Sequence, residues 1–169
     1  MGISLPAAAD LDVACRPMTD ADLAFVAAVY ASTRLDELAR TGWPPEQMHA
    51  FLAHQHHAQH EYYRAHYPGA EWLIVEREGQ PIGRLYLVEW ERELRIIDIS
   101  LMPSARGGGI GGAILADVIA AARAVGKKVS IHVEQDNRAR GLYVRLGFEP
   151  VEQRGVYTLM EWPGGTAPA

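Results

Sequence analysis

The stretch Arg106-Gly107-Gly108-Gly109-Ile110-Gly111-Gly112 separates an apolar segment, RIIDISLM at positions 95–102, from a segment with helical periodicity. The apolar segment is rich in β-branched and aliphatic residues, which favours a buried strand. A glycine-rich turn that opens a helix leaves several backbone N–H groups unpaired, and the helix dipole adds about half a positive charge there. The stretch therefore predicts a strand, a turn and a helix that bind a phosphate or pyrophosphate. The apolar residues with helical spacing are Ile110, Ile114, Leu115, Val118, Ile119, Ala122 and Val125.

The glycines also fit other kinds of turn. Gly107, Gly109 and Gly112 have the G-x-G-x-x-G spacing of dinucleotide-binding folds, and Glu134 follows about where a ribose-binding acid would lie. Two features are against that interpretation. The segment 103–106 separates the strand from the glycines, whereas a dinucleotide fold turns there directly, and too few residues follow for the second half of its sheet. No Lys-Ser or Lys-Thr pair follows, which excludes a nucleoside-triphosphate P-loop. A turn that only connects strand and helix needs one glycine, not five in seven residues. The favoured interpretation is a turn that binds the phosphate of another kind of cofactor.

Length and composition bound the class of protein. A chain of 169 residues with 49% hydrophobic residues suits one domain, which we expect over 11–162, with 1–10 and 163–169 as disordered tails. A net charge of −5 without a basic stripe is against a nucleic-acid partner. Cys15 is the single cysteine, which indicates a reducing compartment. We find no signal peptide and no apolar run of about 20 residues, so we expect a cytoplasmic protein that does not enter a membrane.

The order of the predicted elements indicates a mixed α/β fold, with an antiparallel start and one crossover helix between parallel strands. Segment 32–45 has no clear pattern and is not assigned. Strands are expected at 13–18, 71–77, 82–89, 95–102, 128–134, 148–153 and 156–162, and helices at 19–30, 46–66, 110–125 and 137–146.

A second informative block begins at Asn137 and continues to Leu142-Tyr143-x-x-Leu146-Gly147-Phe148. Together with Leu101-x-Pro103-x-x-Arg106-Gly107-x-Gly109-Ile110-Gly111, it resembles the GNAT superfamily of acyl-CoA-dependent N-acyltransferases. The resemblance implies an N-acetyltransferase domain of the GNAT fold. This fold has a central mixed sheet of about seven strands flanked by about four helices. Segments 95–102 and 128–134 would be its parallel strands, which splay apart at the acyl-CoA site.

The resemblance also implies that acetyl-CoA, or another acyl-CoA, is the co-substrate. Its pyrophosphate would lie on the N–H groups of 106–112, and its pantetheine arm would lie between the splayed strands. Asn137 is equally suited to capping the next helix, and its spacing to Tyr143 is one residue shorter than in the family pattern. The residues implied at the cofactor are Leu101, Met102, Arg106, Gly107, Gly108, Gly109, Ile110, Gly111, Gly112 and Asn137.

Transfer of an acyl group from a thioester to an amine needs a proton donor for the departing thiolate. Tyr143 stands at the family's position for this general acid. Its alternative role is to pack a short helix onto the sheet. A backbone N–H near Leu101 would stabilise the oxyanion.

The amine also needs a base, for which two residues are the main candidates, and Glu134 at the end of segment 128–134 is a third. Asp98, which strict alternation puts on the same face as Ile96, is the first candidate, and its alternative role is a salt bridge to Arg84 or Arg95. His132 is the second candidate because its ordinary pKa is close to neutral, although a histidine in a strand is more often structural.

The segment 46–66 carries a stripe at helical spacing that begins apolar and becomes polar. In the family that this chain resembles, such a helix walls the acceptor pocket, so Gln55, Gln59 and Tyr62 are candidate substrate residues. The alternative is a helix that is core at one end and surface at the other. His56 and His60 have metal-binding spacing, but no Glu or Cys accompanies them, so we expect a solvated face and no metal.

These patterns predict an acyltransferase that moves an acyl group from acyl-CoA directly to a primary amine in a ternary complex. The amine is that of a small molecule, a peptide or a protein. The alternative is a non-catalytic domain that binds or senses acyl-CoA. A homodimer is also possible, with 156–162 pairing across the interface.

Overall fold

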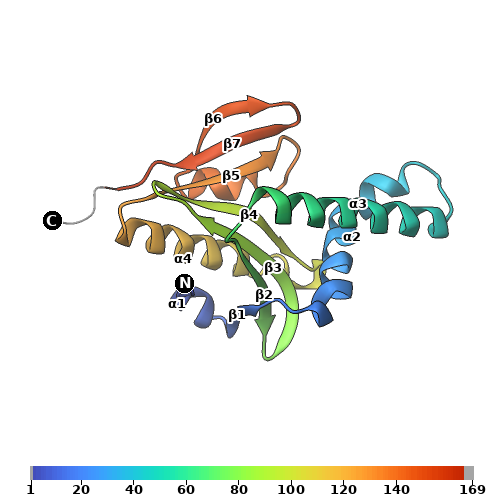
Figure 1. Cartoon of the computed structure of the whole chain (residues 1–169), viewed down its shortest axis with the longest axis horizontal. Helices are drawn as coiled ribbons and strands as arrows, with labels where there is room; N and C mark the ends of the chain where they lie inside the picture. Colours follow the sequence, from blue (N-terminus) through green and yellow to red (C-terminus); the bar gives the residue numbers. More distant parts are fainter. Residues whose placement is uncertain (1, 166–169) are drawn as a thin grey trace.

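The central sheet has seven strands in the order β1-β2-β3-β4-β5-β7-β6 (Figure 1). The computed structural model describes residues 2–165. Only β4 and β5 run parallel, whereas the other neighbours are antiparallel, which confirms the mixed α/β class. The strands are β1 Val13–Pro17, β2 Glu71–Arg77, β3 Gln80–Glu89, β4 Glu93–Leu101, β5 Lys128–Glu134, β6 Glu149–Arg154 and β7 Tyr157–Trp162.

The helices lie on both faces of this sheet (Figure 1). They are α1 Pro6–Ala9, α2 Leu23–Ala39, α3 Pro45–His66, α4 Ile110–Ala124 and α5 Arg140–Arg145, with short 3₁₀ turns at Asp20–Asp22 and Pro103–Ala105. Helix α2 continues well beyond the expected end at Tyr30. The hydroxyl groups of Ser32 and Thr33 donate to the carbonyls of Val29 and Tyr30, both at 2.6 Å, and so remain compatible with the helix.

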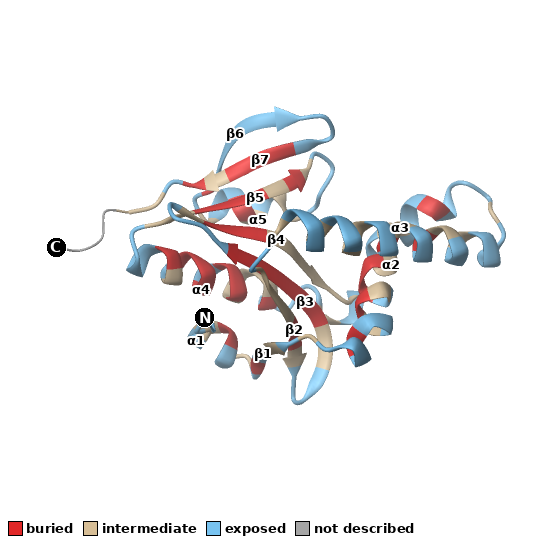
Figure 2. Ribbon diagram, in the orientation of Figure 1, coloured by how far each residue is buried: buried red, intermediate tan, exposed pale blue. Residues whose placement is uncertain are grey.

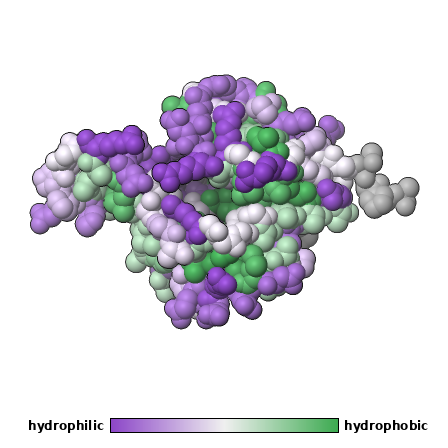
Figure 3. Space-filling model, turned by 180° about the vertical axis from the view of Figure 1, so that it is seen from behind, coloured by the Kyte–Doolittle hydropathy of each residue, from purple (hydrophilic) through white to green (hydrophobic). Residues whose placement is uncertain are grey.

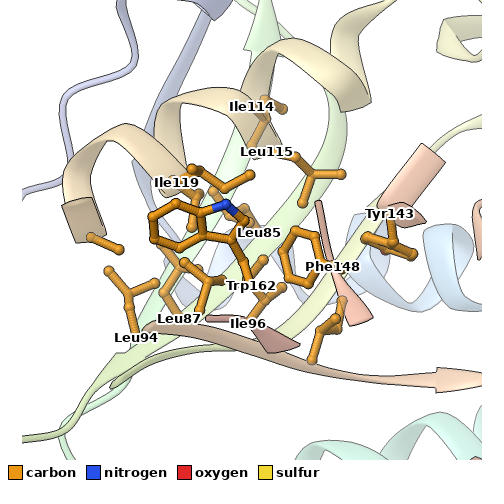
Figure 4. Close-up of a cluster of buried hydrophobic side chains, with 14 of the residues drawn as sticks. Leu85, Leu87, Leu94, Ile96, Ile114, Leu115, Ile119, Tyr143, Phe148 and Trp162 are labelled. Atoms are coloured by element: carbon orange, nitrogen blue, oxygen red, sulfur yellow. The ribbon is translucent and has the colours of Figure 1, made fainter. Parts of the chain in front are cut away.

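The apolar core lies between α4 and one face of the sheet. Ile114, Leu115 and Ile119 of α4 pack toward Leu85 of β3 and Ile96 of β4 (Figure 4). Figure 2 shows buried residues concentrated on α4 and the central strands, whereas β6 is exposed along its whole length. The spacing that predicted α4 therefore reports its burial directly from Ile110 to Ala122, whereas Val125, the last residue of the stripe, is the C-cap and is exposed.

The N-terminal segment differs from its expected disorder. Residues 6–9 form α1, in which Ala8 is fully buried. The backbone N–H groups of Ala7 and Ala8 donate to the carboxylate of Asp117 on α4, at 3.0 and 2.9 Å. A buried carboxylate needs donors, and the first turn of a helix supplies free ones. Of the expected C-terminal tail, 163–165 lie outside any helix or strand, and 166–169 lie outside the described residues.

Replacement of Asp117 by alanine should therefore destabilise the fold. The change leaves one buried and one half-buried N–H group without an acceptor, and we expect a loss of about 2 kcal/mol in the free energy of unfolding. Urea denaturation followed by tryptophan fluorescence measures it. Asp117→Asn, which retains one acceptor oxygen, should lose less, and equal stability of all three proteins would contradict this role for Asp117.

The parallel strands β4 and β5 pair only over their first halves. The register joins Glu93–Ile96 to Lys128–Ile131, and beyond these residues the two strands have no ladder with each other. The ends of β4 and β5 thus splay apart, as the family resemblance implied. The opening between them lies next to the N-terminus of α4, because the 3₁₀ turn Pro103–Ala105 is the only element between β4 and the glycine turn.

Strand β7 lies between β5 and β6 and is paired on both sides. The proposed pairing of 156–162 across a dimer is therefore wrong, because this strand has no free edge. In the described sheet the free edges belong to β1 and β6.

Candidate active site

The glycine turn presents a row of free backbone donors. No hydrogen bond within the described part of the chain uses the N–H groups of residues 107–112. Gly109 is the N-cap of α4 with φ +82°, a conformation that side chains rarely adopt. Residues 106–109 are exposed. An anion at this helix N-terminus would therefore meet several aligned donors.

Arg106 bridges the turn and its surroundings. Its Nε donates to the carbonyl of Leu101 at the end of β4, at 3.0 Å, and its Nη2 lies 3.4 Å from the hydroxyl of Ser32 on α2. The N–H of Met102 donates to the carbonyl of Ile82 at 2.8 Å, which ends the strand pairing. The guanidinium is exposed beside the glycines, so it adds positive charge to the same place.

The second sequence block packs against the first. A Cβ built at Gly112 would lie 3.6 Å from Leu142 Cδ1, so α5 touches the first turn of α4. Tyr143 is 3% exposed and meets Phe148 edge to face, with ring centroids 5.6 Å apart (Figure 4). Its hydroxyl makes no hydrogen bond with another described residue. Burial, aided by the charge of Asp98, raises the pKa of Tyr143, so the hydroxyl keeps its proton at neutral pH.

Asn137 serves a local structural role. Its Oδ1 accepts a hydrogen bond from the N–H of Ala139 at 2.8 Å, and its own carbonyl accepts one from the N–H of Arg140. The exposed side chain thus orders the turn before α5, but the N-cap of α5 is Ala139, so Asn137 is not the capping residue.

Asp98 lies on the face opposite to the one that alternation predicted. The register shifts between Tyr86 and Leu87, so that Tyr86 faces Asp98 and Leu87 faces Ile96. Ile97 is the additional residue of this β-bulge, and it reverses the alternation along β4. Ile96 therefore packs in the core under α4, and Asp98 points to the α3 side of the sheet.

Asp98 belongs to a hydrogen-bond network on that side. It forms a salt bridge with Arg84, whose Nη2 lies 2.9 Å from Oδ2 and whose side chain is only 2% exposed. The hydroxyls of Ser100 and Tyr63 also donate to its carboxylate, at 2.7 and 3.3 Å. Gln59 of α3 accepts from Arg84 at 2.9 Å. Both carboxylate oxygens are thus occupied, and of the two arginines considered, Arg84 is the partner.

His132 is the first residue of β5 beyond the part that pairs with β4. Arg95 Nη1 lies 3.3 Å from its Nδ1, and because arginine only donates, Nδ1 is the acceptor and the ring proton is on Nε2. Arg95 also donates to Ser130 at 2.6 Å, and Ser130 in turn bonds to Glu93. Burial, followed by the charge of Arg95, lowers the pKa of His132, so the ring is neutral at neutral pH.

A cleft of about 760 Å³ opens between α2, α3 and the end of β5. Gln55 and Gln59 of α3 line it, and Gln55 accepts a hydrogen bond from Tyr30 at 3.1 Å. Tyr62 lies outside the lining, is 54% exposed and stacks on His66 at 3.9 Å. Figure 3 shows the far side of the molecule, on which the projecting end of α2 and α3 is mainly hydrophilic.

The ion pair between Arg34 and Glu134 joins two walls of this cleft. Arg34 Nη2 lies 2.5 Å from Oε1, and Nη1 lies 3.2 Å from Oε2, which makes the contact bidentate. The two residues are 100 positions apart, and no local pattern could have paired them. Trp43 and Tyr157 also line the cleft and were not singled out from the sequence.

The histidines of α3 differ in burial. Within residues 2–165, no group of three His, Cys, Asp or Glu side chains could hold a metal ion. His56 was expected on a solvated face, but it is only 8% exposed. Its Nε2 is buried and has no hydrogen-bond partner among the described residues. Burial and the charges of Arg84 on β3, and of His60 and His57 on α3, lower the pKa of His56 to about 4, although Asp98 on β4 opposes the shift.

This shift should make the fold sensitive to mild acid. The unfolded chain binds a proton on His56 below pH 6.5, whereas the folded chain stays neutral until about pH 4, so stability is lost as pH falls between these values. We expect about 2 kcal/mol less stability at pH 5 than at pH 7.5 from this residue. Urea denaturation at both pH values measures it. His56→Phe keeps an aromatic ring beside Tyr30 and should lose less on acidification, with the remainder due to His60 and His132, whose pKa values are also lowered. An identical loss in wild type and variant would contradict the role of His56.

Comparisons with known proteins agree with this geometry. The sequence profile of the acetyltransferase (GNAT) family matches residues 33–148. The PaiA N-acetyltransferase of Thermoplasma acidophilum, solved with coenzyme A, superposes with a TM-score of 0.65 at 15% identity, over 88% of this chain and 97% of that one. A Corynebacterium glutamicum protein described as histone acetyltransferase HPA2 and related acetyltransferase gives 0.64 at 21% identity, over 92% and 98%. An acetyltransferase from Thermus thermophilus gives 0.61 at 18% identity, over 88% and 95%.

No sequence among the curated proteins matches this chain significantly. None of the helices within residues 2–165 has the length and apolar character needed to cross a bilayer.

Proposed function

The chain belongs to the GNAT acetyltransferase family, and from this premise we propose that it moves an acetyl or another acyl group from acyl-CoA directly to a primary amine in a ternary complex. The observation that carries the proposal is the row of free N–H groups at 107–112, packed against the helix that holds the unpartnered hydroxyl of Tyr143. The first feature suits a pyrophosphate and the second suits protonation of a leaving thiolate.

The cofactor site in this proposal follows the end of β4 and the start of α4. The N–H groups from Gly107 to Gly112 would bind the pyrophosphate, with Arg106 as a charged partner. Leu101 and Met102 would offer backbone groups to the pantetheine arm in the opening between β4 and β5. Asn137 contributes by ordering the turn before α5 rather than by touching the arm, which its bond to Ala139 supports.

Tyr143 is the proposed general acid. Burial keeps its hydroxyl protonated at neutral pH, so a proton is available for the thiolate as it leaves the tetrahedral intermediate. A backbone N–H near Leu101, on the part of β4 that β5 does not pair with, would stabilise the oxyanion.

Of the two candidate bases, His132 is the one that we propose. Both oxygens of Asp98 already accept hydrogen bonds from Arg84, Ser100 and Tyr63, which suits a structural anion. His132 is partly exposed, and its lowered pKa leaves the ring neutral at neutral pH, with a lone pair on Nδ1. Proton uptake would occur at Nδ1, with release of the contact from Arg95.

His132→Gln should then lower kcat about 100-fold at pH 7 and flatten the acid limb of the pH–rate profile. The loss should shrink as pH rises, because more of the amine is already neutral. Acetyl-CoA turnover, measured as thiol release between pH 6 and 9, tests this. Asp98→Asn should lower the unfolding temperature while leaving the shape of the profile unchanged, and a flattened profile for Asp98→Asn instead would transfer the base role to Asp98.

Thermal unfolding with saturating acetyl-CoA, coenzyme A or NADH tests the proposal as a whole. A ligand at 100 times its Kd adds about 2.7 kcal/mol of stability, which raises the unfolding temperature by several degrees. We expect stabilisation by the two CoA compounds only, followed by thiol release with a primary amine. Stabilisation by NADH alone would overturn the proposal in favour of a dinucleotide site.

A further inference from the structure

The cleft between α2, α3 and the end of β5 is lined by aromatic side chains and by more carboxylates than cations. We propose that the acceptor is a primary amine with an aromatic or other apolar body and no carboxylate group. The inference rests on the proposed function, because it names the acceptor class for that same transfer.

The first argument is the apolar part of the lining. Trp43 and Phe51 meet edge to face with centroids 5.2 Å apart, and Tyr30 and Tyr157 contribute two further aromatic rings. Leu38 of α2, which packs in one cluster with Leu52 of α3, belongs to the same lining. A volume of about 760 Å³ is that of a pocket for a drug-sized molecule, far more than a methylamine fills. These aromatic and aliphatic side chains contribute most binding free energy when they bury an apolar part of the acceptor.

The second argument is the balance of charge. The lining contains three carboxylates, Glu37, Glu134 and Asp136, against one cationic side chain, Arg34. The guanidinium of Arg34 already binds Glu134 through two nitrogens and lies 3.5 Å from Glu37. A carboxylate on the acceptor would therefore enter a negatively charged cleft whose one guanidinium is already paired, and like charges at such a contact are unfavourable.

The third argument is that the protein itself holds a cation in this lining. The Cζ atom of Arg34 lies 5.9 Å from the centroid of the Tyr30 ring, while its nitrogens bind Glu134. An aromatic face next to a carboxylate attracts an ammonium group by the same interactions. The arriving amine, which is cationic before it loses its proton, is thus attracted by the walls that repel a carboxylate.

A matched pair of acceptors tests the inference. Phenethylamine and phenylalanine differ only in the carboxylate, and methylamine lacks the apolar body. We would measure binding of each to the CoA-loaded protein by calorimetry, and kcat/KM for each with acetyl-CoA by thiol release. We expect phenethylamine to exceed both others by about tenfold or more in affinity and in kcat/KM. Equal or better binding of phenylalanine, or equal binding of methylamine, would overturn the inference.

Charge-neutralising variants locate the effect in the cleft. Glu37→Gln and Asp136→Asn should each reduce the preference for phenethylamine over phenylalanine several-fold. Glu91→Gln removes an exposed carboxylate in the turn between β3 and β4 and should leave the preference unchanged. A preference that neither cleft variant alters would overturn the charge argument. Binding of phenethylamine without any acyl transfer would overturn the proposed function and leave the inference on the cleft intact.

Discussion

Tyr143→Phe should lower kcat about 100-fold or more while leaving the affinity for coenzyme A unchanged. The variant loses only the hydroxyl, which makes no hydrogen bond with another described residue, so nothing in the folded chain depends on it. The phenyl ring retains its edge-to-face contact with Phe148. The departing thiolate would then have to take its proton from water, which slows the step that the hydroxyl assists. Pre-steady-state thiol release, with calorimetry for coenzyme A, separates the two effects.

Tyr67→Phe is the matched control for this change. Tyr67 lies just after α3 and stacks on Trp90, away from the glycine turn, so its loss of a hydroxyl should not alter turnover. If Tyr143→Phe keeps full kcat when the chemical step limits turnover, Tyr143 is a packing residue, which is the alternative that its buried ring supports.

Gly111→Val should weaken the binding of coenzyme A about 100-fold, equivalent to the loss of one or two hydrogen bonds to a charged group. A Cβ at Gly111 meets no protein atom within 4 Å, and its φ is not positive, so the folded chain has space for a side chain there. The isopropyl group would instead occupy the space over the free N–H groups that the pyrophosphate needs. Calorimetric titration with coenzyme A measures the loss.

Two further variants make this result interpretable. Ala116→Val adds a valine to the exposed face of α4 without obstructing the turn, so it tests whether a valine in this helix disturbs binding by itself. It should bind coenzyme A normally. Gly109→Val should lose both binding and stability, because Gly109 has φ +82° and valine is strained there. Normal binding by a folded Gly111→Val protein would exclude 107–112 as the pyrophosphate site.

Local sequence patterns were sufficient where the physical cause is local. The helical stripe from Ile110 to Ala122 and the glycines before it predicted α4 and its turn, because burial on one face and backbone freedom both act over a few residues. The same holds for α3, which runs from Pro45 to His66 and was expected at 46–66. The comparisons confirm the GNAT fold and family, while the roles of the individual site residues stay predictions.

The predictions that failed depended on contacts between distant segments. The helix at 6–9 is ordered by Asp117, more than 100 residues away, so its small residues alone indicated a tail. Asp98 changed faces because a bulge at Ile97, set by the pairing of β3 with β4, interrupts the alternation that a sequence shows. His56 belonged to a polar run and was nevertheless buried, since α3 packs that side against Tyr30.

The sequence by itself determined a glycine-rich turn between a strand and a helix, and a tyrosine block that resembles the GNAT family. Both follow from backbone conformation and side-chain type within short segments. The tertiary structure alone decided which groups are free to react: it engaged Asp98 with Arg84, left the hydroxyl of Tyr143 without a partner, and joined Arg34 to Glu134 across the cleft. These pairings depend on how α2, α3 and β5 meet in space, and electrostatic interactions depend on distance through space, not on separation along the chain.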